Sequence, residues 1–336
     1  MTQTERGQKG ASCLRWVWWG FGLMVVLGLA AFVIPAVRHA RAIQRLESNP
    51  AIAIEYESGA VLKAMPASWQ RWIQNQAGQG IRAAFEKAFE VDCTKQELSE
   101  ADLVAIGRLS NLKMLFLSHA SFSDAGLSHI TGLSDLKALL MEGSTISDQG
   151  LASVKALQNL KILRLGETGI SDQGLIHLKD LSRLEFLELG ETSISDAGLI
   201  HLRGLMNLKH LILVKTRIGD AGLSYLKGHP KLLGLNLEGT QVSDEGLVYL
   251  VDLKNLEELG LAQLNISDQG LKHLQVLSNL KGLNLEHTNI SDAGIIHLQG
   301  LKNLRYLNLD GTRVTAAGYE RLKASLPNLE KPMQPR

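Results

Sequence analysis

The side chains with the most evident chemistry recur at a fixed interval of 24 residues. An aspartate column runs from Asp124 to Asp292, and a serine precedes each aspartate except Asp220, which follows Gly219. A serine at the start of a helical turn accepts backbone N–H groups, and a carboxylate there favours the positive end of the helix dipole. We therefore interpret this carboxylate array as a set of helix caps rather than as catalytic acids.

A second column is made of histidines, with two tyrosines in the intervening copies. Its members are His129, His177, His201, Tyr225, Tyr249, His273 and His297. If each lies on a separate convex helix, its neighbours are roughly 8–10 Å away, which is too far to share a metal ion held by bonds of about 2 Å. The column predicts a partly exposed stacking ladder and no metal site.

The motifs of the common enzyme classes are absent from the sequence. It has no His-Glu-x-x-His, no phosphate-binding loop, no nucleophile elbow and no paired cysteine spacing. Its two cysteines, Cys13 and Cys93, cannot form a metal cluster or a disulfide framework. The net charge of +1 and the lack of a basic stripe argue against nucleic-acid binding. The sequence predicts a protein that is not an enzyme, with no catalytic residues and no cofactor.

The repeated leucines show what the interval means for the fold. In the copy at 159–170, Leu163 and Leu165 alternate with Ile162 and Arg164, which is typical of a short strand with one buried face. No single copy can bury that face, but stacked copies form a continuous core.

The same copy carries a family resemblance. Leu160, Leu163, Leu165 and Ile170 follow the pattern L-x-x-L-x-L-x-x-N/C-x-L, with Thr168 where Asn or Cys is usual. The region therefore resembles a leucine-rich repeat. The resemblance implies an α/β fold: a right-handed solenoid with a parallel concave sheet and short convex helices. We assign residues 91–327 to one degenerate and nine full repeats, and 328–336 to a C-terminal tail.

The second half of each copy predicts a short helix on the convex side. Ser171 is placed to cap its start, Leu175 and Leu178 face inward, and Gly174 could let neighbouring repeats approach closely. A threonine column can hydrogen-bond backbone groups of the descending turn. It comprises Thr168, Thr192, Thr216, Thr240, Thr288 and Thr312, with breaks at Ala120 and Leu264.

The N-terminal part predicts a membrane anchor. Residues 1–15 form a short basic tail, and residues 16–37 contain no charge. As a helix this segment would span roughly 33 Å, enough for a bilayer core. Its apolar run is long for a cleavable signal peptide, so we expect an uncleaved single-pass anchor. We expect the tail to remain in the cytoplasm and the repeats to lie outside it, because large downstream domains cross regardless of charge.

Residues 38–90 are expected to join the anchor to the repeats and to cap the solenoid. Within them, 38–46 predicts a helix, 51–56 a short strand, and 81–89 an amphipathic helix. With this layout the whole chain resembles the membrane-anchored leucine-rich repeat proteins of planctomycete-type bacteria. That resemblance implies architecture and location rather than a mechanism.

The concave face is where repeat proteins bind. Its outward strand positions are mainly apolar in the first five full copies and polar or acidic in the last four. The apolar half is either a partner-binding stripe or is covered by residues 51–90 folding back over it. The acidic half is either a solvated face or a docking site for a basic peptide or a glycan. The candidate contact residues are Phe116, Leu140, Phe186, Asn284, Glu286, Tyr306 and Asn308.

Three classes of function stay open from the sequence. The first is a non-catalytic module at the cell envelope that binds a protein or an envelope polysaccharide. The second is a structural envelope protein whose repeats self-associate. The third is a cytoplasm-facing adaptor that selects substrates for another enzyme, which requires the opposite membrane orientation.

Overall fold

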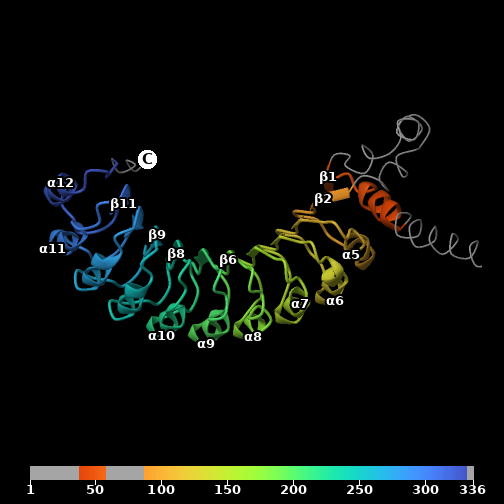
Figure 1. The fold of residues 1–336 in the computed structure, drawn as a ribbon, viewed down its shortest axis with the longest axis horizontal. Helices are drawn as coiled ribbons and strands as arrows, with labels where there is room; N and C mark the ends of the chain where they lie inside the picture. Colours follow the sequence, from red (N-terminus) through yellow and green to blue (C-terminus); the bar gives the residue numbers. More distant parts are fainter. Residues whose placement is uncertain (1–37, 58–86, 331–336) are drawn as a thin grey trace, which may run out of the picture.

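The computed structural model describes residues 38–57 and 87–330. These residues form an arc with a single eleven-stranded sheet on its inner side and short helices on its outer side (Figure 1). The strands follow one another in chain order, from β1 to β11. From β2 onward all neighbours are parallel, because each repeat returns through its outer helix before the next strand begins.

Each full repeat contributes one three-residue strand to the concave sheet. The strands are β3 (Met114–Phe116), β4 (Ala138–Leu140), β5 (Ile162–Arg164), β6 (Phe186–Glu188), β7 (His210–Ile212), β8 (Gly234–Asn236), β9 (Glu258–Gly260), β10 (Gly282–Asn284) and β11 (Tyr306–Asn308). The middle residue of every one of these strands is a buried leucine. The two flanking residues face the concave side. The predicted parallel sheet with one buried face is confirmed.

The outer segments are short α-helices, 3₁₀ helices, or one followed by the other. The α-helices are α5 (Glu100–Gly107), α6 (Asp124–Leu127), α7 (Asp148–Val154), α8 (Asp172–Leu175), α9 (Asp196–Leu199), α10 (Asp220–Leu223), α11 (Asp292–Ile295) and α12 (Ala316–Ser325). The 3₁₀ helices are η1 (Ser128–Gly132), η2 (Ile200–Leu202), η3 (Ser224–Leu226), η4 (Gly246–Asp252), η5 (Gly270–Val276) and η6 (Ile296–Leu298). The short convex helices expected from the repeat pattern are therefore present.

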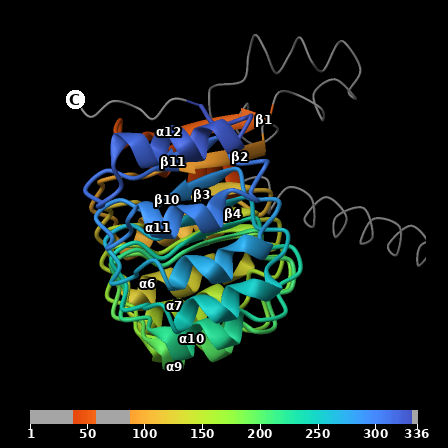
Figure 2. The same ribbon diagram turned by 90° about the vertical axis from the view of Figure 1, so that its left-hand side faces the viewer.

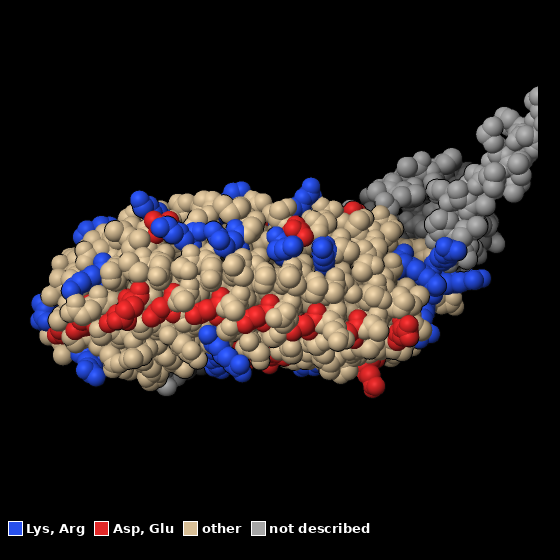
Figure 3. Space-filling model, turned by 90° about the horizontal axis from the view of Figure 1, so that it is seen from below, with Lys and Arg blue, Asp and Glu red and all other residues tan. Residues whose placement is uncertain are grey.

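The aspartate column links each repeat to the next. Asp172 Oδ1 accepts the backbone N–H of Ser195 at 2.8 Å, and its Oδ2 accepts the Ser195 hydroxyl at 2.6 Å. The same pair of bonds joins Asp148 to Ser171 at 2.8 and 2.5 Å. The serine hydroxyl also caps its own helix, so the serine prediction is confirmed. The carboxylates lie on the convex side, along which acidic residues form a row (Figure 3).

The repeated glycine makes room for this carboxylate. A Cβ placed on Gly198 would collide with Asp172 Oδ1 and would lie 3.0 Å from Leu175 Cδ1 in the preceding repeat. The same Asp-against-Gly contact recurs at Gly150, Gly174, Gly222, Gly246, Gly270, Gly294 and Gly318. Glycine is therefore required for close approach between repeats rather than for backbone conformation.

Two further polar ladders hold the turns. The Thr168 hydroxyl donates to Leu165 O at 2.5 Å, and the Thr192 hydroxyl donates to Leu189 O at 2.6 Å, which confirms the predicted role of the threonines. A ladder of asparagines was not predicted. Asn207 Nδ2 donates to Ser182 O at 2.7 Å, and equivalent bonds are made by Asn159, Asn255, Asn279, Asn303 and Asn328. These bonds satisfy carbonyl groups in turns that lack a regular partner.

The described part of the N-terminal segment extends the sheet. β1 (Ala53–Glu57) pairs antiparallel with β2 (Lys87–Asp92), and β2 pairs parallel with β3. The amphipathic helix predicted for 81–89 is wrong at 87–89, where strand pairing on both sides overrides the local pattern. β1 and β2 continue the edge of the sheet instead of lying over its concave face (Figure 1). Residues 58–86 lie outside the described ranges.

A helix over residues 38–47 packs beside this edge and buries Ile43 and Leu46. Arg45 Nε donates to Asp102 Oδ1 at 2.8 Å, and Ser99 caps α5 together with Asp102. Partial burial raises the pKa of Asp102, but the hydrogen bonds from Ser99 and the charge of Arg45 outweigh it and lower the pKa. The carboxylate is thus held ionised where the helix meets the first repeat.

The predicted membrane helix at 16–37 lies outside the described residues. Among the residues that are described, no helix is long and apolar enough to cross a membrane.

Cys93 is fully buried in a core column, and burial raises the pKa of its thiol to about 12. At the other end α12 covers the last repeat (Figure 2), with Leu322, Leu326 and Leu329 buried beneath it.

An irregularity interrupts the convex side at 228–230. Gly228 has a φ of +94°, and the histidine that follows it, His229, is only 3% exposed. His229 occupies a column that is otherwise leucine, as at Leu205 and Leu253. Its Nδ1 lies 2.9 Å from Leu226 O and its Nε2 lies 3.1 Å from Leu202 O. A neutral imidazole carries a single N–H, so it can donate to only one of these carbonyls.

The glycine contact makes a prediction about stability. Gly198→Ala should lower the free energy of unfolding by about 2 kcal/mol, because the new Cβ forces the Asp172 carboxylate out of its ladder. Gly132→Ala is the matched control, since a Cβ there meets nothing within 4 Å. Urea unfolding followed by circular dichroism measures both. Equal effects of the two substitutions would show that the ladder contact is not what requires glycine.

The buried histidine makes a second prediction. His229→Leu should lower the free energy of unfolding by about 1 kcal/mol, because it restores the leucine column but leaves a buried carbonyl of Leu226 or Leu202 without its donor. The reverse change one repeat earlier, Leu205→His, should destabilise by about 2 kcal/mol or more. Thermal melts at neutral pH compare the three chains. An unchanged or raised stability in His229→Leu would mean that neither carbonyl depends on the histidine ring.

Candidate functional site

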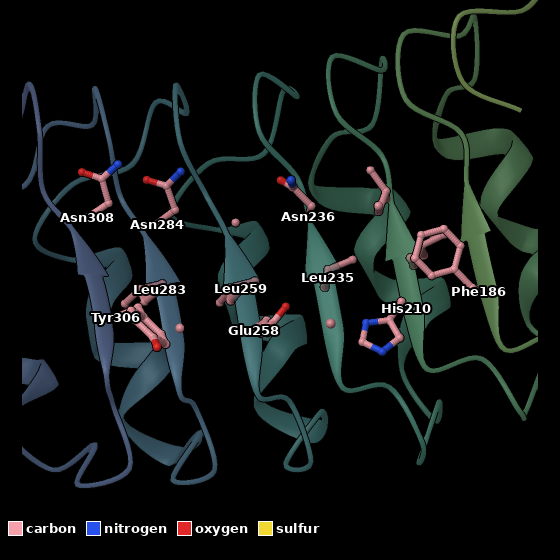
Figure 4. A pocket seen from close by; sticks show the side chains of 15 residues that line it. Phe186, His210, Leu235, Asn236, Glu258, Leu259, Leu283, Asn284, Tyr306 and Asn308 are labelled. Atoms are coloured by element: carbon pink, nitrogen blue, oxygen red, sulfur yellow. The ribbon is translucent and has the colours of Figure 1, made fainter. Parts of the chain in front are cut away.

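The concave face is hollowed over its C-terminal half. A depression of about 500 Å³ extends across β6 to β11 (Figure 4). It is an open groove floored by the sheet, with side chains from several successive repeats at its sides. Because every repeat supplies one strand, the lining residues are far apart in sequence yet adjacent in space.

Strand register arranges the lining in two rows. The first row is Phe186, His210, Gly234, Glu258, Gly282 and Tyr306. The second row is Glu188, Ile212, Asn236, Gly260, Asn284 and Asn308. Neighbours within a row are about 4.8 Å apart along the sheet.

Glycines in the two rows let side chains of the preceding repeat lie over or beside them. A Cβ on Gly234 would lie 2.5 Å from His210 Nδ1, and one on Gly260 would collide with the Asn236 amide. Gly282 is more open, with Glu258 Cγ as the nearest neighbour at 3.8 Å. Glycine in a strand interior often marks a close approach of another group. Here Gly234 and Gly260 leave room for the His210 ring and the Asn236 amide, and the sheet is more open only at Gly282.

Aromatic rings stand at both ends of the first row. The ring centroids of Phe186 and His210 are 6.0 Å apart, and the planes are tilted by 35°. At the other end, Tyr306 is 62% exposed. Figure 4 shows Glu258 between His210 and Tyr306 along the groove. The exposed Tyr306 ring gives the groove an apolar surface next to polar groups, which a ligand could cover.

Asparagine amides line the second row in a fixed orientation. Oδ1 of Asn236 accepts the Glu238 backbone N–H at 3.0 Å, and Oδ1 of Asn284 accepts that of Glu286 at 3.0 Å. Anchoring the oxygen assigns the NH₂ group to the open side, where it can donate to a ligand. Asn308 is anchored in the same way through Asp310, and its Nδ2 donates to Glu286 Oε2 at 3.1 Å.

The groove is acidic. Glu258 is exposed and makes no ion pair or hydrogen bond within the described part of the chain. Glu238 accepts a bond from Gln263 at 3.2 Å, and Glu286 lies 3.6 Å from His287. No lysine or arginine occupies the two rows of β8 to β11. The groove therefore offers a carboxylate without a neutralising partner.

In the N-terminal half of the concave face, charged side chains around β5 pair with one another. Arg164 on β5 lies 2.8 Å from Glu142 and also pairs with Glu188. Burial lowers the pKa of Arg164, but the hydrogen bond and charge of Glu188 and the charge of Glu142 raise it, so the guanidinium stays charged. These contacts leave the Arg164 cation fully partnered.

The candidate contact residues fall into two groups. Phe186, Asn284, Tyr306 and Asn308 line the groove, and Glu286 borders it through Asn308. Phe116 on β3 and Leu140 on β4 lie on the same sheet but outside the groove. The glycines and His210 were not among the candidates. Glycine at an outward strand position is visible in the sequence and could have indicated where the groove lies.

The chemistry of the remaining columns agrees with a structural role. Within residues 38–57 and 87–330, no group of three or more His, Cys, Asp or Glu side chains could hold a metal ion. The column histidines lie on separate repeats, where His129 Nε2 is 3.3 Å from Glu100 and His297 Nδ1 is 2.8 Å from Gln275 Nε2.

The match of a family model agrees with this repeat architecture. The leucine-rich repeat family model matches residues 156–179, 204–227, 228–251 and 276–298. Among solved structures, internalin C2 of Listeria monocytogenes is 27% identical, with 63% of this chain and 84% of that chain covered at a TM-score of 0.48. Internalin F of the same organism is 20% identical, with 79% and 93% covered at a TM-score of 0.40. No curated protein matches the chain.

The repeat columns, the parallel concave sheet and the family match define the class. The described residues have the fold of a leucine-rich repeat solenoid, and the family model matches four segments within it.

Proposed function

We propose that this protein is a non-catalytic binding module that captures an extended segment of another protein along the groove of β6 to β11. The single observation that carries the proposal is the groove itself, a hollow of about 500 Å³ with the half-buried ring of Phe186 at one end, the exposed ring of Tyr306 at the other, and Glu258 between them. Folding does not need these features, since the core lies on the opposite face of the same strands. Exposed apolar groups beside fixed polar groups are typical of binding surfaces.

A protein segment fits the groove better than a neutral polysaccharide. The groove presents an unpaired carboxylate at Glu258 and outward amides at Asn236 and Asn284. Amide groups pair well with peptide carbonyls, and the carboxylate is complementary to a basic side chain. A neutral glycan would leave the carboxylate without a cation.

We also propose that the repeats stand outside the cytoplasm on a single-pass anchor at 16–37. The support comes from the sequence: 22 residues without charge, tryptophans at one end, and a short basic tail before them. The resemblance to membrane-anchored leucine-rich repeat proteins of planctomycete-type bacteria agrees with this placement. The ligand would then be a protein of the envelope or of the cell's surroundings.

A binding prediction follows from the groove. Peptides of random sequence selected by display on the purified full chain should lose about tenfold in affinity on Phe186→Ala and on Tyr306→Ala, the scale of an ordinary interface hot spot. Phe116→Ala is the matched control on the same sheet, and there the affinity should change less than about twofold. Isothermal titration calorimetry measures the affinities, and unchanged thermal melts exclude unfolding.

Two results would overturn this function. Selection of no peptide, together with binding of the chain to an array of envelope polysaccharides, would identify a glycan-binding module. Concentration-dependent sedimentation without any captured ligand would identify a self-associating structural protein.

A topology prediction follows from the anchor. In cells that carry the protein, added protease should digest the repeats in intact cells or in spheroplasts, before lysis. The expected product is a membrane-bound fragment that retains the N-terminal tail, detected with an epitope placed before residue 16. Protection of the repeats until lysis would reverse the orientation and favour a cytoplasmic adaptor.

A further inference from the structure

The groove contains a slot whose shape and charge specify one kind of side chain. The slot lies above Gly234 on β8, between His210 on β7 and Glu258 on β9. The His210 ring leans over Gly234, with its Nδ1 2.5 Å from where a Cβ on Gly234 would stand, so the slot lies between the outer face of this ring and the Glu258 side chain on the next strand. Figure 4 shows the His210 ring and the Glu258 side chain on either side of Leu235.

We propose that this slot receives an arginine side chain of the bound segment. This inference rests on the proposed function and names the residue type that the groove selects. A planar guanidinium can stack on the imidazole of His210 and donate to the Glu258 carboxylate at the same time. Phe186 supports the stacking face, since its ring centroid is 6.0 Å from that of His210.

Charge complementarity supports a cation in this position. Glu258 makes no hydrogen bond or ion pair within the described ranges, although glutamates elsewhere on this face are paired, as Glu142 and Glu188 are with Arg164. Glu238 and Glu286 add negative charge along the same stretch of the sheet, and the two rows of β8 to β11 contain no basic residue. A cation of the ligand would pair with Glu258, as Arg164 on β5 pairs with Glu142 and Glu188.

The amides of the second row fix where the ligand backbone runs. Asn236 and Asn284 flank Gly260 in register, and both keep their NH₂ groups on the open side. Carbonyl groups of a peptide lying over Gly260 can accept hydrogen bonds from these NH₂ groups. The arginine side chain of the same peptide can then enter the slot, which lies in the first row. Tyr306, beyond the open space at Gly282, is then available to an apolar or aromatic residue of the same segment.

The test uses peptides selected by display on the full chain. We expect most of them to contain arginine. Replacing that arginine with citrulline, which keeps the shape and removes the charge, should weaken binding about fivefold to tenfold on the unaltered chain. On Glu258→Gln the same replacement should have less than about twofold effect, because the charge partner is gone. Glu286→Gln, a carboxylate outside the slot, should leave the full arginine effect in place.

A second variant separates shape from charge. Gly234→Ala displaces the His210 ring, because the new Cβ would lie 2.5 Å from its Nδ1, so the chain should fold normally and lose the arginine preference. Peptides that bind without a basic residue, or an arginine effect that persists unchanged in Glu258→Gln, would overturn the slot while leaving the binding function intact. Selection of no peptide at all would overturn both.

Discussion

The architecture depends on the carboxylate that each repeat extends to the next. Asp172 accepts both the backbone N–H and the hydroxyl of Ser195, and its oxygen lies where the side chain of residue 198 would otherwise be. These two bonds and this contact fix the distance between successive outer turns. The leucine core can then stack in register along the whole arc.

A scaffold fixed in this way leaves the concave positions free to vary. The residues that hold the repeats together lie in the buried columns, on the convex turns and in the loops. The flanking positions of each strand contribute little to the core, and they range from a closed ion-pair network around Arg164 to the open groove around Glu258. The two halves of the concave face therefore differ because of the side chains at these flanking positions, since the backbone of the repeats is nearly the same throughout.

The sequence was sufficient for most of the fold because its period places equivalent residues next to each other. The buried leucines, the capping serines and the threonine bonds all follow from one copy read at the interval of 24 residues. The aspartate was assigned to its own helix, whereas its partners belong to the next repeat, so a local capping rule missed the contact. The strand at Lys87–Asp92 was missed for a similar reason, since pairing with β1 and β3 determines it. The groove was hardest to predict, because it depends on three positions, Gly234, Gly260 and Gly282, that have no side chain to suggest a contact.

Those glycines also give the best argument that the groove is functional. Glycine inside a strand costs stability relative to a larger residue, roughly 0.5–1 kcal/mol each. An exposed tyrosine and an unpaired glutamate add nothing to the core beneath them. Other positions in the same rows carry side chains that pack or pair, as Phe186 does with His210 and Arg164 with Glu188. Gly234 and Gly260 leave room for His210 and Asn236, which face the groove, whereas Gly282 has no neighbour that requires it. A ligand lying across β8 to β10 would offset the cost of these glycines.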